Sequence, residues 1–181
     1  LRLPHDDPEQ RIGIPRRILA LATAAVSVWF FAAMNGSSLG TLEAFPPPDP
    51  YPGTRSASAK IQWLTDYDLA VARAKSENKA LFINFTGITC VNCREMEKNV
   101  LPLPEVVKEI DKFIPVELYT DRQSPEDAKN QQLLVKLAKT TANPVYAVVD
   151  MNGRLINSVA GRHTPKEFTK FLQEAHAQTQ L

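Results

Sequence analysis

The only two cysteines of the chain lie three residues apart. They are Cys90 and Cys93, in the stretch FTGITCVNCREMEKNV, which follows an apolar run and precedes a segment with the pattern of a helix. A thiolate, not a thiol, attacks a disulfide, and the N–H groups and dipole at a helix start stabilise such a charge. We therefore expect Cys90 to be the exposed attacking sulfur. Cys93, one helical turn on, would resolve a mixed disulfide by attacking Cys90.

Other uses of such a cysteine pair fit the sequence less well. A structural disulfide here would close a very short loop and constrain the unfolded chain little. A zinc site needs four ligands, and His5, His163 and His176 stand at no zinc-like spacing from the cysteines. Haem attachment needs His directly after the second cysteine, where this chain has Arg94. Redox chemistry is thus the preferred interpretation, and a Cu(I) thiolate site is the main alternative.

Two polar residues near the cysteines are further candidates. Glu97 follows Cys93 by four positions, so both share one face of the predicted helix, where a carboxylate could hold a proton during exchange. Its spacing alone nevertheless fits a solvated surface glutamate better. Asn84 lies in the apolar run before Cys90, where a buried amide needs hydrogen-bond partners. It could orient water near the sulfurs or merely satisfy the backbone.

Asn143 and Pro144 stand directly before the apolar run VYAVV. An X-Pro bond in a folded protein is cis in only about one case in twenty. In this fold context we expect the cis form, which would bring a backbone edge beside the sulfurs for an extended partner segment to pair with. The alternative is a proline tolerated at the first residue of a strand.

From residue 61 onward, the pattern predicts a compact α/β domain. Its elements would be a helix from Tyr67, a strand at 80–85, the cysteine helix to Asn99, a short helix within 101–112, a strand at 113–119, a helix opened by Ser124, a hairpin of 145–149 and 155–160, and a final helix opened by Thr164 with Glu167. A CXXC motif between a buried strand and a helix is typical of the thioredoxin-like fold, a central mixed β-sheet flanked by helices.

The N-terminal part has the pattern of a membrane anchor. Residues 18–42 contain no charge, and a spanning helix needs about 20 such residues. Arginines precede this run and acidic residues follow it, which predicts a cytoplasmic N-terminus. We expect a cytoplasmic loop at 1–17, a transmembrane helix at 18–42, a Pro-rich linker at 43–60 and a thioredoxin-like domain at 61–181. A secretory signal peptide or a buried soluble helix are the alternatives.

Length and charge limit the class of protein. The 181 residues suffice for one ordinary domain with appendages, and the first residue, Leu1, is compatible with a piece of a longer protein. With 21 basic and 20 acidic residues, the chain has no charge excess that would favour nucleic-acid binding.

The quoted stretch resembles the C-terminal thioredoxin-like domain of the DsbD family, the transmembrane thiol:disulfide interchange proteins. LRLPHDDPEQRIGIPRR, the apolar run and LEAFPPP resemble the last cytoplasmic loop, last membrane helix and periplasmic linker of such a protein, so the resemblance covers nearly the whole chain. It implies that Cys90 and Cys93 are the redox pair and that Glu97 matches an acid of the family. Asn84 departs from the family's common Asp and leaves open how Cys93 is deprotonated. Thr89 stands where many thioredoxins have Trp.

The resemblance implies a protein-disulfide reductase of the bacterial inner membrane with its C-terminal domain in the periplasm. Electrons would pass from a membrane relay domain, of the same or a partner protein, to periplasmic thiol-disulfide oxidoreductases. We expect no cofactor and no metal, since the Cys90–Cys93 disulfide is itself redox-active, and we expect Asn143, Pro144 and Thr89 to contact partners. An anchored protein serving apocytochrome c maturation proteins, or a non-enzymatic Cu(I)-binding module, are the alternatives.

Overall fold

The computed structural model describes residues 13–34 and 61–179. The chain divides into two compact units, Leu1–Gly40 and Thr41–Leu181, which are described separately. The predicted linker at 43–60 lies outside the described residues. So do residues 1–12 of the predicted loop and residues 35–42 of the predicted membrane helix.

The described residues of the first unit, 13–34, form the helix α1 (Ile14–Met34), which begins before the predicted start at residue 18. Pro15 is compatible with this earlier start because the first helical turn needs no N–H donor from it. Residues Ile14–Ala32 have a mean hydropathy of 1.4, and none of the most apolar stretch is buried in the structure. The helix is therefore long and apolar enough to cross a membrane, although a signal peptide would have the same properties.

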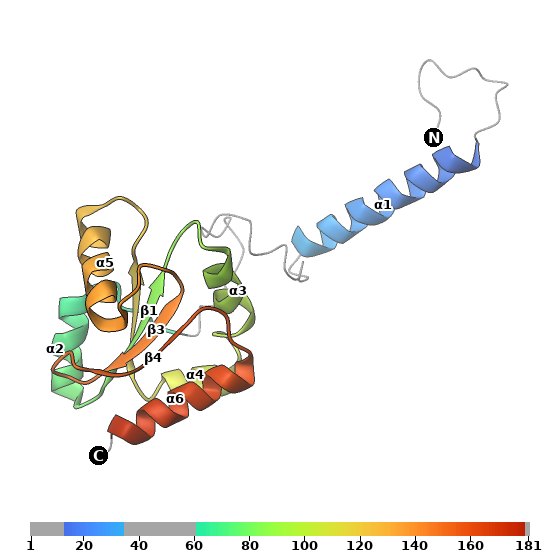
Figure 1. Cartoon of the computed structure of the whole chain (residues 1–181). Helices are drawn as coiled ribbons and strands as arrows, with labels where there is room; N and C mark the ends of the chain where they lie inside the picture. The colour runs from blue at the N-terminus through green and yellow to red at the C-terminus, as the bar shows by residue number, and fades with distance from the viewer. Residues whose placement is uncertain (1–12, 35–60, 180–181) are drawn as a thin grey trace. The chain divides into compact units, whose positions relative to one another are not determined.

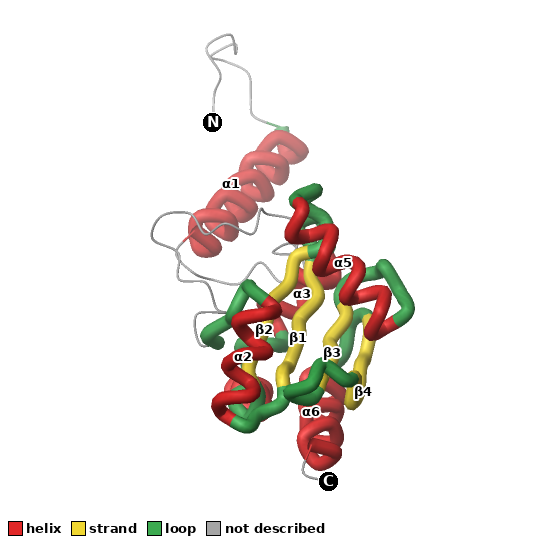
Figure 2. Tube along the Cα trace, turned by 90° about the vertical axis from the view of Figure 1, so that its left-hand side faces the viewer, coloured by secondary structure: helices red, strands yellow, loops and turns green. Residues whose placement is uncertain are grey.

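The second unit is built on a four-stranded mixed sheet (Figure 2). Its strands are β1 (Leu81–Thr86), β2 (Ile114–Tyr119), β3 (Val145–Val149) and β4 (Leu155–Ala160), in the order β2-β1-β3-β4. β1 pairs in parallel with β2 and antiparallel with β3, and β3 and β4 form the predicted hairpin. The continuous apolar runs of β1 and β3 follow from their central places, buried on both faces.

Helices cover both faces of this sheet (Figure 1). One face packs against α3 (Val91–Asn99), α4 (Pro104–Ile110) and α6 (Pro165–Thr179), and the other against α2 (Tyr67–Glu77) and α5 (Pro125–Ala138). The predicted helix starts are confirmed, because Ser124 accepts the N–H of Asp127 and Thr164 and Glu167 cap each other. This arrangement is the thioredoxin-like α/β fold.

The side chains of β1 alternate between two cores. Leu81, Ile83 and Phe85 face the aliphatic core under α2 and α5, whereas Phe82 joins aromatic rings under α3, α4 and α6. Because the strand repeat is two residues, Asn84 and Thr86 must face the same side as Phe82. The sheet therefore presents these two buried polar side chains towards the cysteine helix.

Candidate active site

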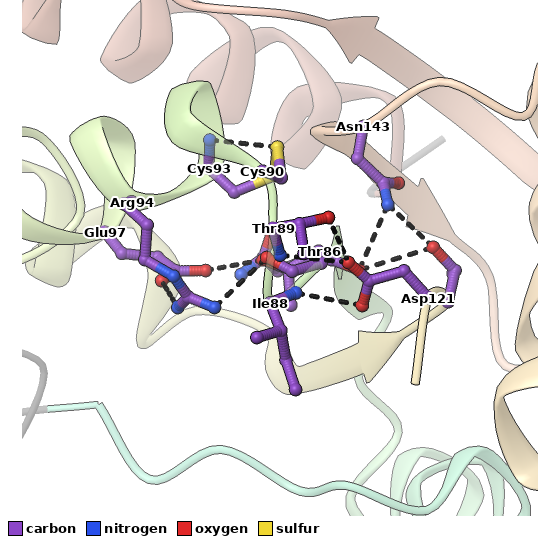
Figure 3. The surroundings of a disulfide bond; sticks show 12 residues. Thr86, Ile88, Thr89, Cys90, Cys93, Arg94, Glu97, Asp121 and Asn143 are labelled. Carbon is purple, nitrogen blue, oxygen red and sulfur yellow. Dashed lines mark hydrogen bonds and ion pairs between the residues drawn. A yellow bond between two sulfur atoms is a disulfide. The ribbon is translucent and has the colours of Figure 1, made fainter. Parts of the chain in front are cut away.

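A disulfide joins Cys90 and Cys93 at the start of α3 (Figure 3). Cys90 is the N-cap residue, and its Sγ accepts the N–H of Cys93 at 3.2 Å. Cys90 is partly exposed, whereas Cys93 is fully buried. The structure thus places one sulfur where a partner can reach it and where helix N–H groups favour a thiolate. The other sulfur lies behind it, as the spacing predicted.

The loop before Cys90 is held by Asp121, which lies two residues after β2 ends at Tyr119. Its carboxylate accepts the N–H groups of Ile88 and Thr89 at 2.9 and 3.1 Å, and the Thr89 hydroxyl at 3.1 Å. Partial burial raises the pKa of the Asp121 carboxyl, but the hydrogen bonds from Thr89 and Ile88 outweigh it, and the net pKa lies below its ordinary value. Asp121 is therefore a charged clamp on the active-site loop.

Gly87 permits this close approach. A Cβ at this position would lie 2.7 Å from Oδ2 of Asp121 and 3.2 Å from Nδ2 of Asn143. The loop can therefore pass the carboxylate only because residue 87 has no side chain.

The residues beside Cys90 are exposed and partly apolar. Ile88 and Val91 are 41% and 42% exposed, on either side of the motif's first cysteine. Thr89 is also exposed, but its hydroxyl is bound to Asp121. That Thr89 contacts a partner stays a prediction.

The bond between Asn143 and Pro144 is cis, as expected. Nδ2 of Asn143 donates to the Thr86 carbonyl at 3.1 Å and to the Thr120 hydroxyl at 2.6 Å. Asn143 thus ties the start of β3 to the ends of β1 and β2, and Figure 3 shows it beside the loop that precedes Cys90. The carbonyl of Pro144 accepts the N–H of Gly161 at 2.9 Å. Pairing of a partner segment here stays a prediction.

Glu97 is not a solvated surface residue, so the interpretation that its spacing favoured is wrong. Its side chain is 14% exposed, and its Oε1 accepts the Thr86 hydroxyl at 2.6 Å. Its Oε2 pairs at 2.6 Å with Arg94, which is 6% exposed and also donates to the Gly87 carbonyl. A buried carboxylate needs such a partner, and Arg94 supplies it.

Asn84 is fully buried on β1, and its Nδ2 donates to Oε1 of Glu117 on β2 at 3.3 Å. The strand register places Glu117 on one side of Asn84 and Tyr146 of β3 on the other. Within the described part of the chain, Oδ1 of Asn84 and the hydroxyl of Tyr146 are buried without a hydrogen-bond partner. We call Asn84, Arg94, Glu97, Glu117 and Tyr146 the buried polar cluster, in which the two glutamates are partly buried and the other three residues are buried.

The charge state of Glu117 is unusual. Burial, together with the nearby Glu97 carboxylate, raises the pKa of Glu117 to about 7, against the opposing effects of Arg94, Asn84 and Arg122. Burial likewise raises the pKa of Tyr146 well above its ordinary value. Tyr146 is therefore a neutral hydroxyl, and Glu117 can exchange a proton near neutral pH.

The model of the thioredoxin-like domain family matches residues 67–176. The chain belongs to the thioredoxin-like family. The comparison with curated proteins found no match.

Solved structures share this fold. A thioredoxin from Thermus thermophilus is 19% identical, with a TM-score of 0.57, covering 66% of this chain and 90% of its own. The oxidised C-terminal domain of Neisseria meningitidis DsbD is 19% identical, with a TM-score of 0.54. The match covers 63% of this chain and 99% of the DsbD domain. A DsbH oxidoreductase is 22% identical, with a TM-score of 0.52. The match covers 74% of this chain and 94% of the DsbH chain. At these identities the likeness establishes the fold.

Several residues at the site of this thioredoxin-like domain were missed by sequence reasoning. Asp121 follows a strand parallel to the one that leads to the cysteines, and parallel strands end at the same edge of a sheet. Glu117 is the one charged residue in the strand Ile114–Tyr119. Both patterns are visible in the sequence and could have marked these residues.

The described residues contain no group of three or more His, Cys, Asp or Glu side chains placed to hold a metal ion. His163 and His176, the two histidines within residues 61–179, lie instead against the aromatic core, beside Phe168 and Phe113.

Proposed function

We propose that this thioredoxin-like protein reduces disulfides in other proteins by thiol-disulfide exchange at Cys90 and Cys93. The observation that carries the proposal is the disulfide between a partly exposed sulfur at a helix N-terminus and a fully buried one. An accessible thiolate can attack a partner disulfide. A buried thiol nearby can then attack the mixed disulfide and release the partner.

In the reduced protein, the Cys90 thiolate attacks a partner disulfide. The partner's S–S bond breaks, one of its sulfurs leaves as a thiolate, and the other is joined to Cys90. The Cys93 thiolate then attacks Sγ of Cys90, and the partner's second sulfur leaves. Two electrons have passed to the partner, and the Cys90–Cys93 disulfide seen in the structure has formed. A donor dithiol restores the reduced pair by the reverse sequence.

We further propose that the domain is tethered to the bacterial inner membrane and acts in the periplasm, as in the DsbD family. The apolar helix α1 and the arginines at its start support this location. The electron donor would then be a membrane relay domain of the same or a partner protein. The acceptors would be periplasmic thiol-disulfide oxidoreductases.

Trapping of mixed disulfides tests the roles of the two cysteines. Cys93→Ser should accumulate disulfide-linked partners because the resolving sulfur is missing, whereas Cys90→Ser should trap few or none. Non-reducing electrophoresis measures the complexes, and mass spectrometry identifies the partners. Equal trapping by both variants would contradict the assigned roles.

A reductase assay separates this proposal from metal binding. The parent protein, supplied with a thiol donor, should reduce insulin, and the Cys90→Ser variant should not. Tight Cu(I) binding by the parent without any insulin reduction would favour the copper-binding alternative. Apocytochrome c maturation proteins among the trapped partners would assign the domain to that pathway.

A further inference from the structure

Glu117 carries a partly buried carboxylate that the exchange reaction described above does not use. It lies on β2 opposite Asn84, which donates to it at 3.3 Å. Tyr146 lies opposite Asn84 on the other side, so the three side chains form a row across one face of β2, β1 and β3. α3 covers this face, because Glu97 bonds to Thr86 and Met96 shares a core with Tyr146.

The cations near Glu117 are engaged elsewhere. Arg94 of α3 pairs with Glu97 at 2.6 Å, and Arg122 pairs with Asp127 at 3.0 Å. Glu117 has no ion pair among the described residues and receives only the amide hydrogen bond from Asn84. The other titratable groups that face it are Glu97 and the phenols of Tyr119 and Tyr146. This environment disfavours the charged carboxylate, so Glu117 can take up a proton near neutral pH.

Exchange at the cysteines needs such a group. Cys93 is fully buried and must lose a proton before it can attack Cys90. Asn84 lies on the strand that leads to the cysteines, but its amide cannot accept this proton. The carboxylate lies instead on the neighbouring strand, within the buried polar cluster. Three atoms of this cluster, Oδ1 of Asn84, Nε of Arg94 and the Tyr146 hydroxyl, have no hydrogen-bond partner among the described residues, and of these the hydroxyl can both donate and accept a hydrogen bond.

We propose that Glu117 holds the proton that Cys93 loses during disulfide exchange, acting through the buried polar cluster. The inference rests on the proposed function. As the mixed disulfide resolves, the proton of the Cys93 thiol passes to Glu117, and the Cys93 thiolate attacks Sγ of Cys90. The bond from Cys90 to the partner sulfur breaks, and that sulfur leaves as a thiolate. The cysteine pair is oxidised and the partner disulfide is reduced. In the reverse direction, Cys93 leaves as a thiolate and regains the proton from Glu117.

A single-turnover experiment separates the two chemical steps. The reduced full chain, in detergent solution, is mixed with excess oxidised glutathione between pH 5.5 and 8.5 and quenched with acid. Mass spectrometry follows the mixed disulfide of Cys90 with glutathione and its conversion to the Cys90–Cys93 disulfide. Formation of the adduct reports the attack by Cys90, and its disappearance reports the resolution by Cys93.

Substitutions of Glu117 should affect only the second step. In the parent protein, the resolution rate should rise with pH through an inflection near 7. Glu117→Gln should slow resolution at least about tenfold at pH 7.5 and remove the inflection, while the adduct forms at the parental rate. Glu117→Asp should retain the inflection. Glu105→Gln, which removes an exposed carboxylate on α4, is the matched control and should leave both steps unchanged.

Moving the carboxylate from position 117 on β2 to position 84 on β1 should rescue the resolution step. Because positions 84 and 117 are register partners, Asn84→Asp combined with Glu117→Gln should restore the fast resolution that Glu117→Gln alone loses. A parental rate and pH profile in Glu117→Gln, or no recovery in the double variant, would overturn the proposal. These outcomes leave the proposed function intact as long as the adduct forms and resolves. Failure of Cys90 to form any adduct would overturn the proposed function itself.

Discussion

At the scale of single residues, the two cysteines differ in exposure because of their positions at the start of α3. Cys90 precedes the first helical turn in an extended conformation, whereas Cys93 lies inside that turn and faces the sheet. Residues three apart at a helix start are neighbours in space, so this asymmetry was visible in their spacing. The surroundings of Glu97 could not be seen in the spacing, because Arg94 and Thr86 contact its carboxylate only once α3 packs on β1.

The raised pKa of Glu117 predicts a specific pH dependence of stability. The folded protein keeps the proton up to a pH near 7, whereas an unfolded glutamate loses it near pH 4.3, so this residue's contribution is full below pH 4 and is lost as the pH rises through 7. Glu117→Gln does not titrate. Relative to the parent, it should therefore gain about 1 to 3 kcal/mol in free energy of unfolding between pH 4.5 and 8.

Urea unfolding of the oxidised proteins at these two pH values measures this difference. The Glu105→Gln variant, which changes an exposed side chain, should have the same free energy of unfolding as the parent at both pH values. A constant difference between Glu117→Gln and the parent across the range would show that Glu117 titrates as an ordinary surface carboxyl.

At the scale of elements, the site is assembled from three segments that are distant in sequence. The loop between β1 and α3 contacts Asp121 after β2, and Asn143 before β3 binds the ends of both strands. The parallel pairing of β1 with β2 is what brings Asp121 to this loop. The loop that presents Cys90 is thus positioned by neighbouring strand ends as well as by its own Gly87.

Gly87→Ala tests this close approach. The added Cβ would lie 2.7 Å from the Asp121 carboxylate, so the loop or the carboxylate must move, at a cost of about 1 to 3 kcal/mol in unfolding free energy. Removal of the carboxylate should relieve the clash, so the same substitution should cost less in an Asp121→Ala background. Urea unfolding of the parent, the two single variants and the double variant measures the cost of Gly87→Ala in each background. Equal costs in both backgrounds would show that Asp121 does not limit residue 87.

At the scale of the whole molecule, the chain combines an apolar helix with a thioredoxin-like domain. α1 exposes its large apolar side chains along its length, Leu19, Val26 and Phe31 among them. The helix is long and apolar enough to cross a lipid bilayer, which would cover this surface. The membrane tether that we propose would confine the exchange reaction to the membrane surface.

Val26→Arg tests the membrane anchor. A central arginine in a spanning helix costs about 2.5 to 3.5 kcal/mol of insertion free energy, so the variant should be largely lost from membranes. Alkaline extraction of membranes from expressing bacteria measures the retained fraction, and Val26→Leu is the conservative control that should stay in the membrane. Recovery of the parent in the extract, or its cleavage near Ala33, would instead indicate a signal peptide.

The sequence alone determined the fold class, the order of the elements and the redox pair. These features are set by local periodicity, helix caps and spacing along one helix, which short stretches of chain already contain. Only the tertiary structure decided that Asp121 clamps the loop, that Arg94 buries Glu97, and that Glu117 stands beside Asn84. Those contacts depend on strand register and on burial, which arise when segments remote in sequence pack together and lose their water.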